Sequence, residues 1–249
     1  MQNSIQHKNT LVSYKVFKNN QSNHYILFMH GFGCDSTIWQ CIQDNLTTGS
    51  NQILIDFPPF GTSGNLLCDW RLDDYTEIVE NILIKENCQK VDLVCHSFGA
   101  RIGIELAIKN SRINKMVFIA GAGIREEKFK TKYKILSYKL KKGLSKIKLY
   151  NKNKLKQYGS DEYMNLSPIM KKTFSNIVNN DQTKKLKYIK NQTLLLWAED
   201  DDTTTIKSAK KMNKLIKNSE LFTFKNGGHF VFIPYAKNTA NAINIFLEL

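Results

Sequence analysis

One serine of the chain stands in a setting that suits a nucleophile. Ser97 follows the apolar run Val91–Cys95 and precedes a helix-like stretch, so it is expected at a tight turn between a strand and a helix. A serine in such a turn adopts a strained backbone conformation that lifts its hydroxyl above the sheet. The backbone doubles back closely there, and the small residues Gly99 and Ala100 permit this. Cys95 is expected to fill the turn as a small residue.

A serine nucleophile needs a general base, and His229 is the best-placed histidine. It lies in Asn226–Phe230, a glycine-containing loop that follows an expected strand and can bend over the carboxyl edge of a sheet. His7 lies in a polar N-terminal arm and His24 begins a strand, so both are expected at the surface. His96 is fixed within the turn beside the serine and is expected to face away from the attacking oxygen.

The acid that orients the base is expected among the four carboxylates Glu199–Asp202, directly after the apolar run Thr193–Trp197. No basic residue lies among them, so ion pairs cannot account for all four carboxylates. One buried carboxylate that holds an imidazole is therefore the functional interpretation. The alternative for the others is helix capping, by Asp202 or by one of Thr203–Thr205. The candidate acid thus lies between the serine and the histidine in the chain.

A second loop supplies candidate donors for the negative oxygen of a tetrahedral intermediate. The segment His30–Gly33 follows another apolar run, and its glycines leave the backbone accessible. We expect the backbone N–H groups of Phe32 and Phe98 to form an oxyanion hole, in which one donor typically contributes about 3 kcal/mol to lowering the barrier. Gly31 in the same loop is a candidate for contact with the substrate.

The elements that must position these residues follow an alternating pattern. Strand-like runs alternate with stretches of helical spacing, which predicts crossover connections and a mostly parallel sheet of the α/β class. Residues 123–190 interrupt this pattern with charged, helix-like sequence, so we expect one core domain, 1–122 and 191–249, carrying a helical, Lys-rich cap rather than a second independent domain. The expected strands are Val12–Phe17, Tyr25–His30, Gln52–Ile55, Val91–Cys95, Lys115–Ala120, Thr193–Trp197 and Leu221–Phe224, and the expected helices are Asp73–Glu86, Ala100–Asn110, Ile206–Asn218 and Tyr235–Leu249.

From about residue 11 to the C-terminus the chain resembles the α/β-hydrolase superfamily. The similarity lies in HGFG at 30–33, DFPPFGTSG at 56–64, CHSFGARI at 95–102, LLLWAEDD at 194–201 and NGGHF at 226–230. The resemblance implies a central sheet flanked by helices with a cap inserted after the sixth strand. It also implies that Asp201, the fourth residue after the tryptophan, is the acid, with Asp202 as the fallback. Cys95, Ala100 and Ala198 replace glycines of the family pattern, which weakens any transfer of substrate identity.

The leading hypothesis is a serine hydrolase that acts on a small ester or related carbonyl compound. The resemblance leaves two alternatives open. One is hydrolysis of a carbon–carbon bond in a vinylogous diketone, which would use the same three residues, and the other is a non-catalytic signalling or receptor role. Arg101 is a candidate for binding a substrate carboxylate, with a salt bridge at the helix start as the alternative. Trp39 and Phe32 are candidates for the acyl pocket, although Trp39 suits the core equally well. We expect no metal and no organic cofactor.

Charge and cysteine content limit the other classes. The net charge is +14, yet the stretch from Arg125 to Lys190 holds 19 of the 36 basic residues and only five of the 22 acidic ones, so one segment carries the whole excess. A solvated helical surface and attraction of anionic substrates are both open interpretations. No nucleic-acid-binding motif accompanies the charge. The five cysteines are odd in number and show no CxxC spacing, so free thiols in a reducing compartment are expected. Together with the polar first residues and the lack of an apolar run near the ~18 residues of a membrane span, they predict a cytoplasmic protein. The oligomeric state is left open.

Overall fold

The computed structural model describes residues 2–19, 22–47, 49–125 and 166–249, which form an α/β fold around one sheet. The strand order is β1-β2-β4-β3-β5-β6-β7-β8, and every neighbouring pair from β4 to β8 is parallel, whereas β1 and β2 are antiparallel additions at one edge. The predicted α/β class with a mostly parallel sheet is confirmed. The strands are β1 (Gln2–His7), β2 (Thr10–Phe17), β3 (His24–Met29), β4 (Asn51–Asp56), β5 (Lys90–His96), β6 (Ile113–Ile119), β7 (Thr193–Ala198) and β8 (Ser219–Phe224).

The central strands are continuous apolar runs because helices cover both faces of the sheet. Every residue of β7 is buried, and in β5 only Lys90 is exposed. Helices α2 (Leu72–Lys85), α3 (Phe98–Lys109) and α7 (Ile206–Leu215) pack on one face, and α1 (Gln40–Gln43) and α8 (Ala236–Leu247) pack on the other. The four predicted helices are therefore confirmed, with ends shifted by at most three residues. Among the described residues, no helix is long and apolar enough to cross a membrane.

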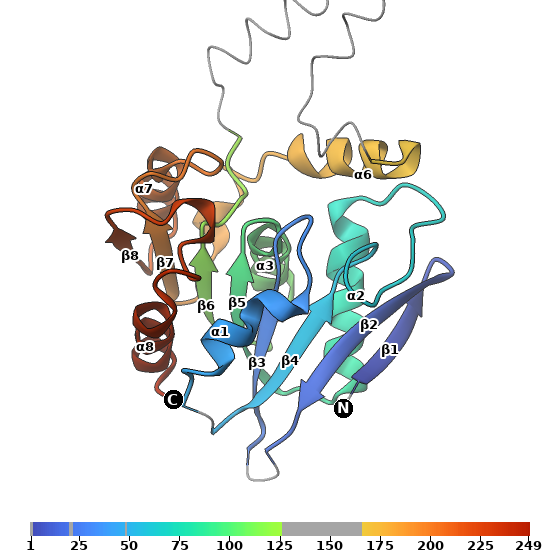
Figure 1. Ribbon diagram of the computed structural model, residues 1–249, viewed down its shortest axis with the longest axis horizontal. Helices are drawn as coiled ribbons and strands as arrows, with labels where there is room; N and C mark the ends of the chain where they lie inside the picture. Colours follow the sequence, from blue (N-terminus) through green and yellow to red (C-terminus); the bar gives the residue numbers. More distant parts are fainter. Residues whose placement is uncertain (1, 20–21, 48, 126–165) are drawn as a thin grey trace, which may run out of the picture.

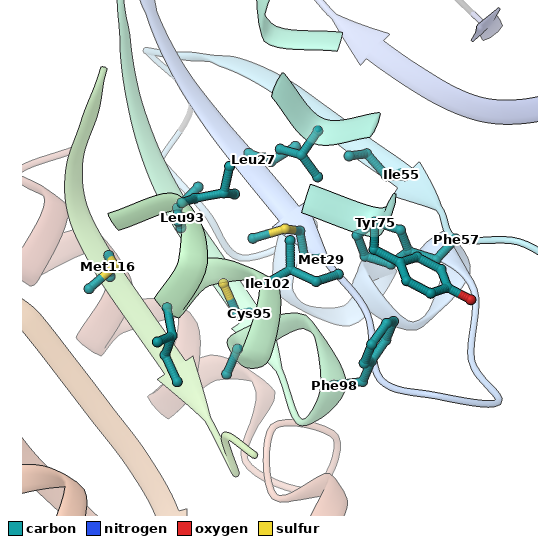
Figure 2. Packing of buried hydrophobic residues seen from close by; sticks show 14 of the residues in the cluster. Leu27, Met29, Ile55, Phe57, Tyr75, Leu93, Cys95, Phe98, Ile102 and Met116 are labelled. Carbon is teal, nitrogen blue, oxygen red and sulfur yellow. The ribbon is translucent and has the colours of Figure 1, made fainter. Parts of the chain in front are cut away.

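Two hydrophobic clusters stabilise the fold, one on each face of the sheet. In the larger cluster, Phe98 at the start of α3 packs edge-on against Tyr75 of α2 and Phe57 (Figure 2). Trp39 lies in the smaller cluster, where it is fully buried and stacks on Phe232 with ring centroids 5.2 Å apart. Its predicted role in the acyl pocket is therefore corrected: Trp39 is a core residue, which was the other interpretation of its sequence position.

The N-terminal residues differ from the polar arm that the sequence suggested. Gln2–His7 form β1, which pairs antiparallel with β2 in a register that sets Gln2 opposite Lys15. His7 is 8% exposed, contacts the Asp74 carboxylate and meets the Trp70 ring edge-on at 5.2 Å. The expectation of a surface histidine was wrong. β1 is an edge strand in which exposed side chains alternate with side chains that face α2, and His7 occupies one of the positions that face α2.

The predicted cap falls in the segment between β6 and β7. Of the range 123–190, residues 126–165 lie outside the described residues, and the remainder contains α6 (Pro168–Val178) and the short helix η3 (Leu186–Tyr188). Figure 1 shows α6 lying across the ends of the parallel strands, where their arrowheads point. It is held there because Thr173 Oγ1 accepts a hydrogen bond from the backbone N–H of Trp70 at 3.0 Å. Ligands of parallel α/β sheets bind at this carboxyl edge.

Candidate active site

The turn between β5 and α3 holds Ser97 in a strained conformation. Its φ of 47° and ψ of −106° are unusual for a residue other than glycine, and such strain is typical of functional sites. The turn is fixed on both sides, because Ser97 donates its backbone N–H to Ile119 O at 3.1 Å and accepts from Ala122 N at 2.9 Å. A Cβ at Gly99 would lie 2.2 Å from Met29 O, so α3 can start this close to β3 only with glycine there.

Ser97, His229 and Asp201 are joined by two hydrogen bonds. His229 Nε2 lies 2.9 Å from Ser97 Oγ, and His229 Nδ1 lies 2.9 Å from Asp201 Oδ2. Because an ionised carboxylate only accepts, Nδ1 carries the proton and Nε2 is free to accept the serine hydroxyl. Asp201 is 3% exposed, whereas Asp202, the fallback acid, is exposed and accepts a hydrogen bond from the Thr203 hydroxyl.

Several donors stabilise the charge of the Asp201 carboxylate. Oδ1 accepts from the backbone N–H groups of Thr203 at 2.8 Å and Thr204 at 3.0 Å, and Oδ2 lies 2.9 Å from the Thr204 hydroxyl. Burial acts to raise the pKa of Asp201, but the hydrogen bond and charge of His229, together with the two backbone donors, outweigh it and lower that pKa below its ordinary value. The carboxylate therefore stays ionised beside the imidazole.

Two further residues position the loop that carries His229. Asp200 accepts hydrogen bonds from the backbone N–H groups of Gly227 at 3.3 Å and Gly228 at 2.8 Å. His96 Nε2 lies 2.9 Å from His229 O, and the two rings are 4.9 Å apart. His96 thus contacts the other histidine rather than lying apart from the site. Neither role was predicted, because hydrogen bonds to backbone groups depend on loop geometry that residue type does not encode.

Burial sets the protonation of the other candidate groups in the turn. Burial lowers the pKa of His96 to about 3, with a smaller contribution from the charge of His229, so its ring is neutral. The pKa of the fully buried Cys95 thiol is raised well above its ordinary value by burial, which makes it inert as a nucleophile. Cys95 packs 3.2 Å from the place where a Cβ at Gly103 would lie, in agreement with its expected filling role.

The loop Gly31–Phe32 lies against the serine turn. A Cβ at Gly31 would be 2.7 Å from His96 Nδ1 and 3.4 Å from Ser97 Cβ, so the close approach requires glycine. His30 Nδ1 lies 2.7 Å from Gly31 O, and His30 Nε2 accepts from the backbone N–H of Phe57 at 2.8 Å. Within the described residues, the backbone N–H groups of Phe32 and Phe98 have no acceptor, which leaves both available to a ligand.

Aromatic rings surround the side chain of Phe32. Its ring centroid lies 5.0 Å from that of Phe60, 6.2 Å from Phe98 and 4.9 Å from Phe174 of α6. The four rings come from four separate segments, so packing between α6 and the rest of the fold adjoins the candidate oxyanion hole. Phe60 lies in the motif at 56–64, whereas Phe174 was not singled out from the sequence, because its ring neighbours are distant in the chain.

Arg101 is a buried cation that forms no ion pair with the residues the structure describes. Its side chain is 7% exposed, and Nη1 donates to Asn180 O at 2.7 Å. The charge of Asp181 acts on Arg101 without an ion pair between them. Burial lowers its pKa to about 10, so it remains charged at neutral pH. The side chain lines a cavity of about 210 Å³ together with Arg125, Thr204 and Ser208.

The fold, the serine turn and the order of the three residues define an α/β hydrolase. The model of the alpha/beta hydrolase family matches residues 26–242, and the chain belongs to this family and is an enzyme of this class.

Among known proteins, the chain is 23% identical over 257 residues to a 2-hydroxy-6-oxo-2,4-heptadienoate hydrolase of Pseudomonas putida, covering 89% of this chain and 88% of the relative. It is 27% identical over 248 residues to a pimeloyl-[acyl-carrier protein] methyl ester esterase of Legionella pneumophila, covering 93% and 98%. An esterase structure from Exiguobacterium antarcticum superposes with a TM-score of 0.78 at 16% identity over 100% of both chains, a likeness of fold.

Proposed function

We propose that the protein is a serine hydrolase that cleaves a small ester or related carbonyl substrate through an acyl-enzyme. Ser97 Oγ attacks the carbonyl carbon while His229 Nε2 takes its proton, and Asp201 stabilises the imidazolium. The backbone N–H groups of Phe32 and Phe98 bind the oxyanion. His229 then gives its proton to the departing alkoxide, and a water activated by the same imidazole releases the acid.

One observation carries this proposal. The continuous chain from Ser97 Oγ to His229 Nε2 and from His229 Nδ1 to Asp201 Oδ2 has both links at 2.9 Å, the separation that proton transfer to a base requires. Two supporting features are the strained serine and the two unused backbone donors beside it. A carboxylesterase-like activity also agrees with the esterases among the relatives.

A second candidate reaction is hydrolysis of a carbon–carbon bond in a vinylogous diketone. The Pseudomonas relative, named a 2-hydroxy-6-oxo-2,4-heptadienoate hydrolase, favours it. The same three residues would serve both reactions, so only substrates separate them. Hydrolysis of p-nitrophenyl acetate and butyrate should exceed turnover of a vinylogous diketone and vanish in Ser97→Ala. Faster turnover of the vinylogous diketone than of the esters would favour a carbon–carbon bond hydrolase. The lack of both activities in folded protein would favour a receptor role.

We further propose that the substrate is a small, anionic molecule whose carboxylate meets Arg101. A buried arginine that forms no ion pair with the described residues is costly, so a negative ligand group in the adjoining cavity would offset that cost. Wild type should prefer carboxylate-bearing esters over neutral ones at low salt and lose the preference as salt rises. Arg101→Met should remove the preference while neutral esters are still cleaved. A preference that is unchanged in Arg101→Met would contradict this assignment.

The compartment is part of the proposal as well. Free thiols suit a reducing environment, and all five cysteines are free, with Cys88 and Cys95 buried. We therefore place the enzyme in the cytoplasm, with a small-molecule substrate rather than a nucleic acid as its ligand.

A further inference from the structure

The hydroxyl of Thr204 lies among three polar groups at the candidate active site. Oγ1 is 2.9 Å from Asp201 Oδ2, 3.0 Å from Ala120 O and 3.4 Å from His229 Nδ1. Ala120 directly follows β6, so this one side chain connects the ends of two neighbouring strands with the acid and the base. None of the sequence motifs includes Thr204.

The backbone of Thr204 is fixed independently of its side chain. Its carbonyl accepts a hydrogen bond from Nε1 of the fully buried Trp197 at 2.7 Å, and its N–H donates to Asp201 Oδ1 at 3.0 Å. The hydroxyl is therefore held beside Oδ2 by a rigid frame. A substitution of the side chain leaves both of these backbone hydrogen bonds in place.

The hydroxyl has one proton and two acceptors within reach, Asp201 Oδ2 and Ala120 O. The ionised carboxylate is the stronger acceptor, so the proton is directed to Oδ2 in the free enzyme. Oδ2 is also the oxygen that accepts His229 Nδ1–H. Two donors thus share one oxygen, and Ala120 O offers the hydroxyl a second position.

We propose that Thr204 is a positioning residue that fixes the Asp201 carboxylate and limits how strongly Oδ2 binds His229. The inference rests on the proposed function and deepens it. In the free enzyme the Thr204 hydroxyl donates to Oδ2, which disperses the negative charge of the carboxylate and stops it from rotating. As His229 becomes an imidazolium, the hydroxyl turns to Ala120 O and leaves Oδ2 to the imidazolium. The hydroxyl proton stays on Thr204 throughout.

Other charged and titratable groups face this site from each element around it. His96 in the serine turn contacts His229, Asp200 binds the loop of His229, and Arg101 and Arg125 line the cavity that Thr204 also lines. None of them contacts the Thr204 hydroxyl. Their influence is therefore the same in variants that differ at position 204 alone.

The test compares Thr204→Val, which removes the hydroxyl, with Thr204→Ser, which keeps it. For Thr204→Val we expect kcat to fall about tenfold, which corresponds to about 1.4 kcal/mol, with KM changed by less than about twofold. Thr204→Val also removes the donor that stabilises the Asp201 carboxylate while His229 is neutral, which favours the protonated imidazole by comparison, so the acid limb of kcat/KM against pH should move to higher pH by about 0.5. Thr204→Ser should restore both quantities. The control variant Thr223→Val, on β8, removes a hydroxyl that donates to Glu199 and should leave both quantities unchanged.

A measurement without turnover completes the test. The proton between His229 Nδ1 and Asp201 gives a downfield NMR resonance, which should move further downfield in Thr204→Val and return in Thr204→Ser. Thr204→Ala replaces the valine variant if valine prevents folding. Equal kcat, pH profile and resonance in wild type and Thr204→Val, or a serine variant as impaired as the valine one, would overturn the proposal. If wild type cleaves no ester, the proposed function fails, and the resonance alone decides the role of Thr204.

Discussion

Lowering the pH should destabilise this protein through His96. The ring is 1% exposed, and burial lowers its pKa to about 3 from an ordinary value of 6.5. His96 Nδ1 has no hydrogen-bond partner among the described residues, so a second proton on the ring would be buried without an acceptor. The folded protein therefore keeps His96 neutral at pH values where the unfolded chain protonates it.

The size of this effect follows from the two pKa values. Because the pKa is depressed in the folded state, the stability is fully present above the unfolded value of 6.5 and is lost as the pH falls below it. Between about pH 7.5 and about pH 5, protonation of His96 in the unfolded chain lowers the free energy of unfolding by about 2 kcal/mol. The folded ring hardly titrates in this window, so nothing offsets the loss. Burial also lowers the pKa of His30, which adds to the wild-type loss in the same direction.

Urea denaturation at both pH values measures the prediction. His96→Asn should be less stable than wild type at the higher pH, because the contact with His229 O is lost, but it should lose about 2 kcal/mol less on going to the lower pH. His30 titrates equally in both proteins and cancels. Ser97→Ala keeps both buried histidines and should follow wild type. Equal losses in wild type and His96→Asn would refute the reasoning.

Three further predictions follow from single contacts. Gly99→Ala should cost about 3 kcal/mol of unfolding free energy in thermal or urea denaturation, because its Cβ would overlap Met29 O. Asp201→Asn should lower kcat about 10⁴-fold in an ester assay without unfolding the protein, because the amide no longer selects the productive tautomer of His229; activity within tenfold of wild type would exclude the assigned acid. Trp39→Ala should cost about 4 kcal/mol of stability and leave KM unchanged, because Trp39 is a core residue. A higher KM in the folded variant would instead show that Trp39 contributes to substrate binding.

The sequence predicted the parts of the site that follow from strand order. Ser97 directly follows β5, and Asp201 and His229 lie in the loops after β7 and β8. The carboxyl ends of parallel strands meet at one edge of the sheet. Continuous apolar runs identified the central strands, and helical spacing identified α2, α3, α7 and α8. Residue type and order were enough, because backbone pairing fixes where these residues lie.

The parts that sequence did not predict depend on packing between distant segments. β1 lacks an apolar run, since an edge strand buries only part of its side chains. Trp39 suited a pocket as well as a core, and only its stacking on Phe232 decides between them. The partners of Arg101 and of the Thr204 hydroxyl are set by the relative placement of loops, which no spacing in the chain records.

The most direct test of the proposed mechanism is covalent labelling of the nucleophile. Wild-type protein treated with a fluorophosphonate should gain one label, which peptide mass spectrometry should locate on Ser97, and folded Ser97→Ala should gain none. His229→Ala should label far more slowly, because the base that activates the serine is absent. A folded wild type that stays unlabelled, or a label that persists in Ser97→Ala, would contradict the assignment of Ser97 as the nucleophile.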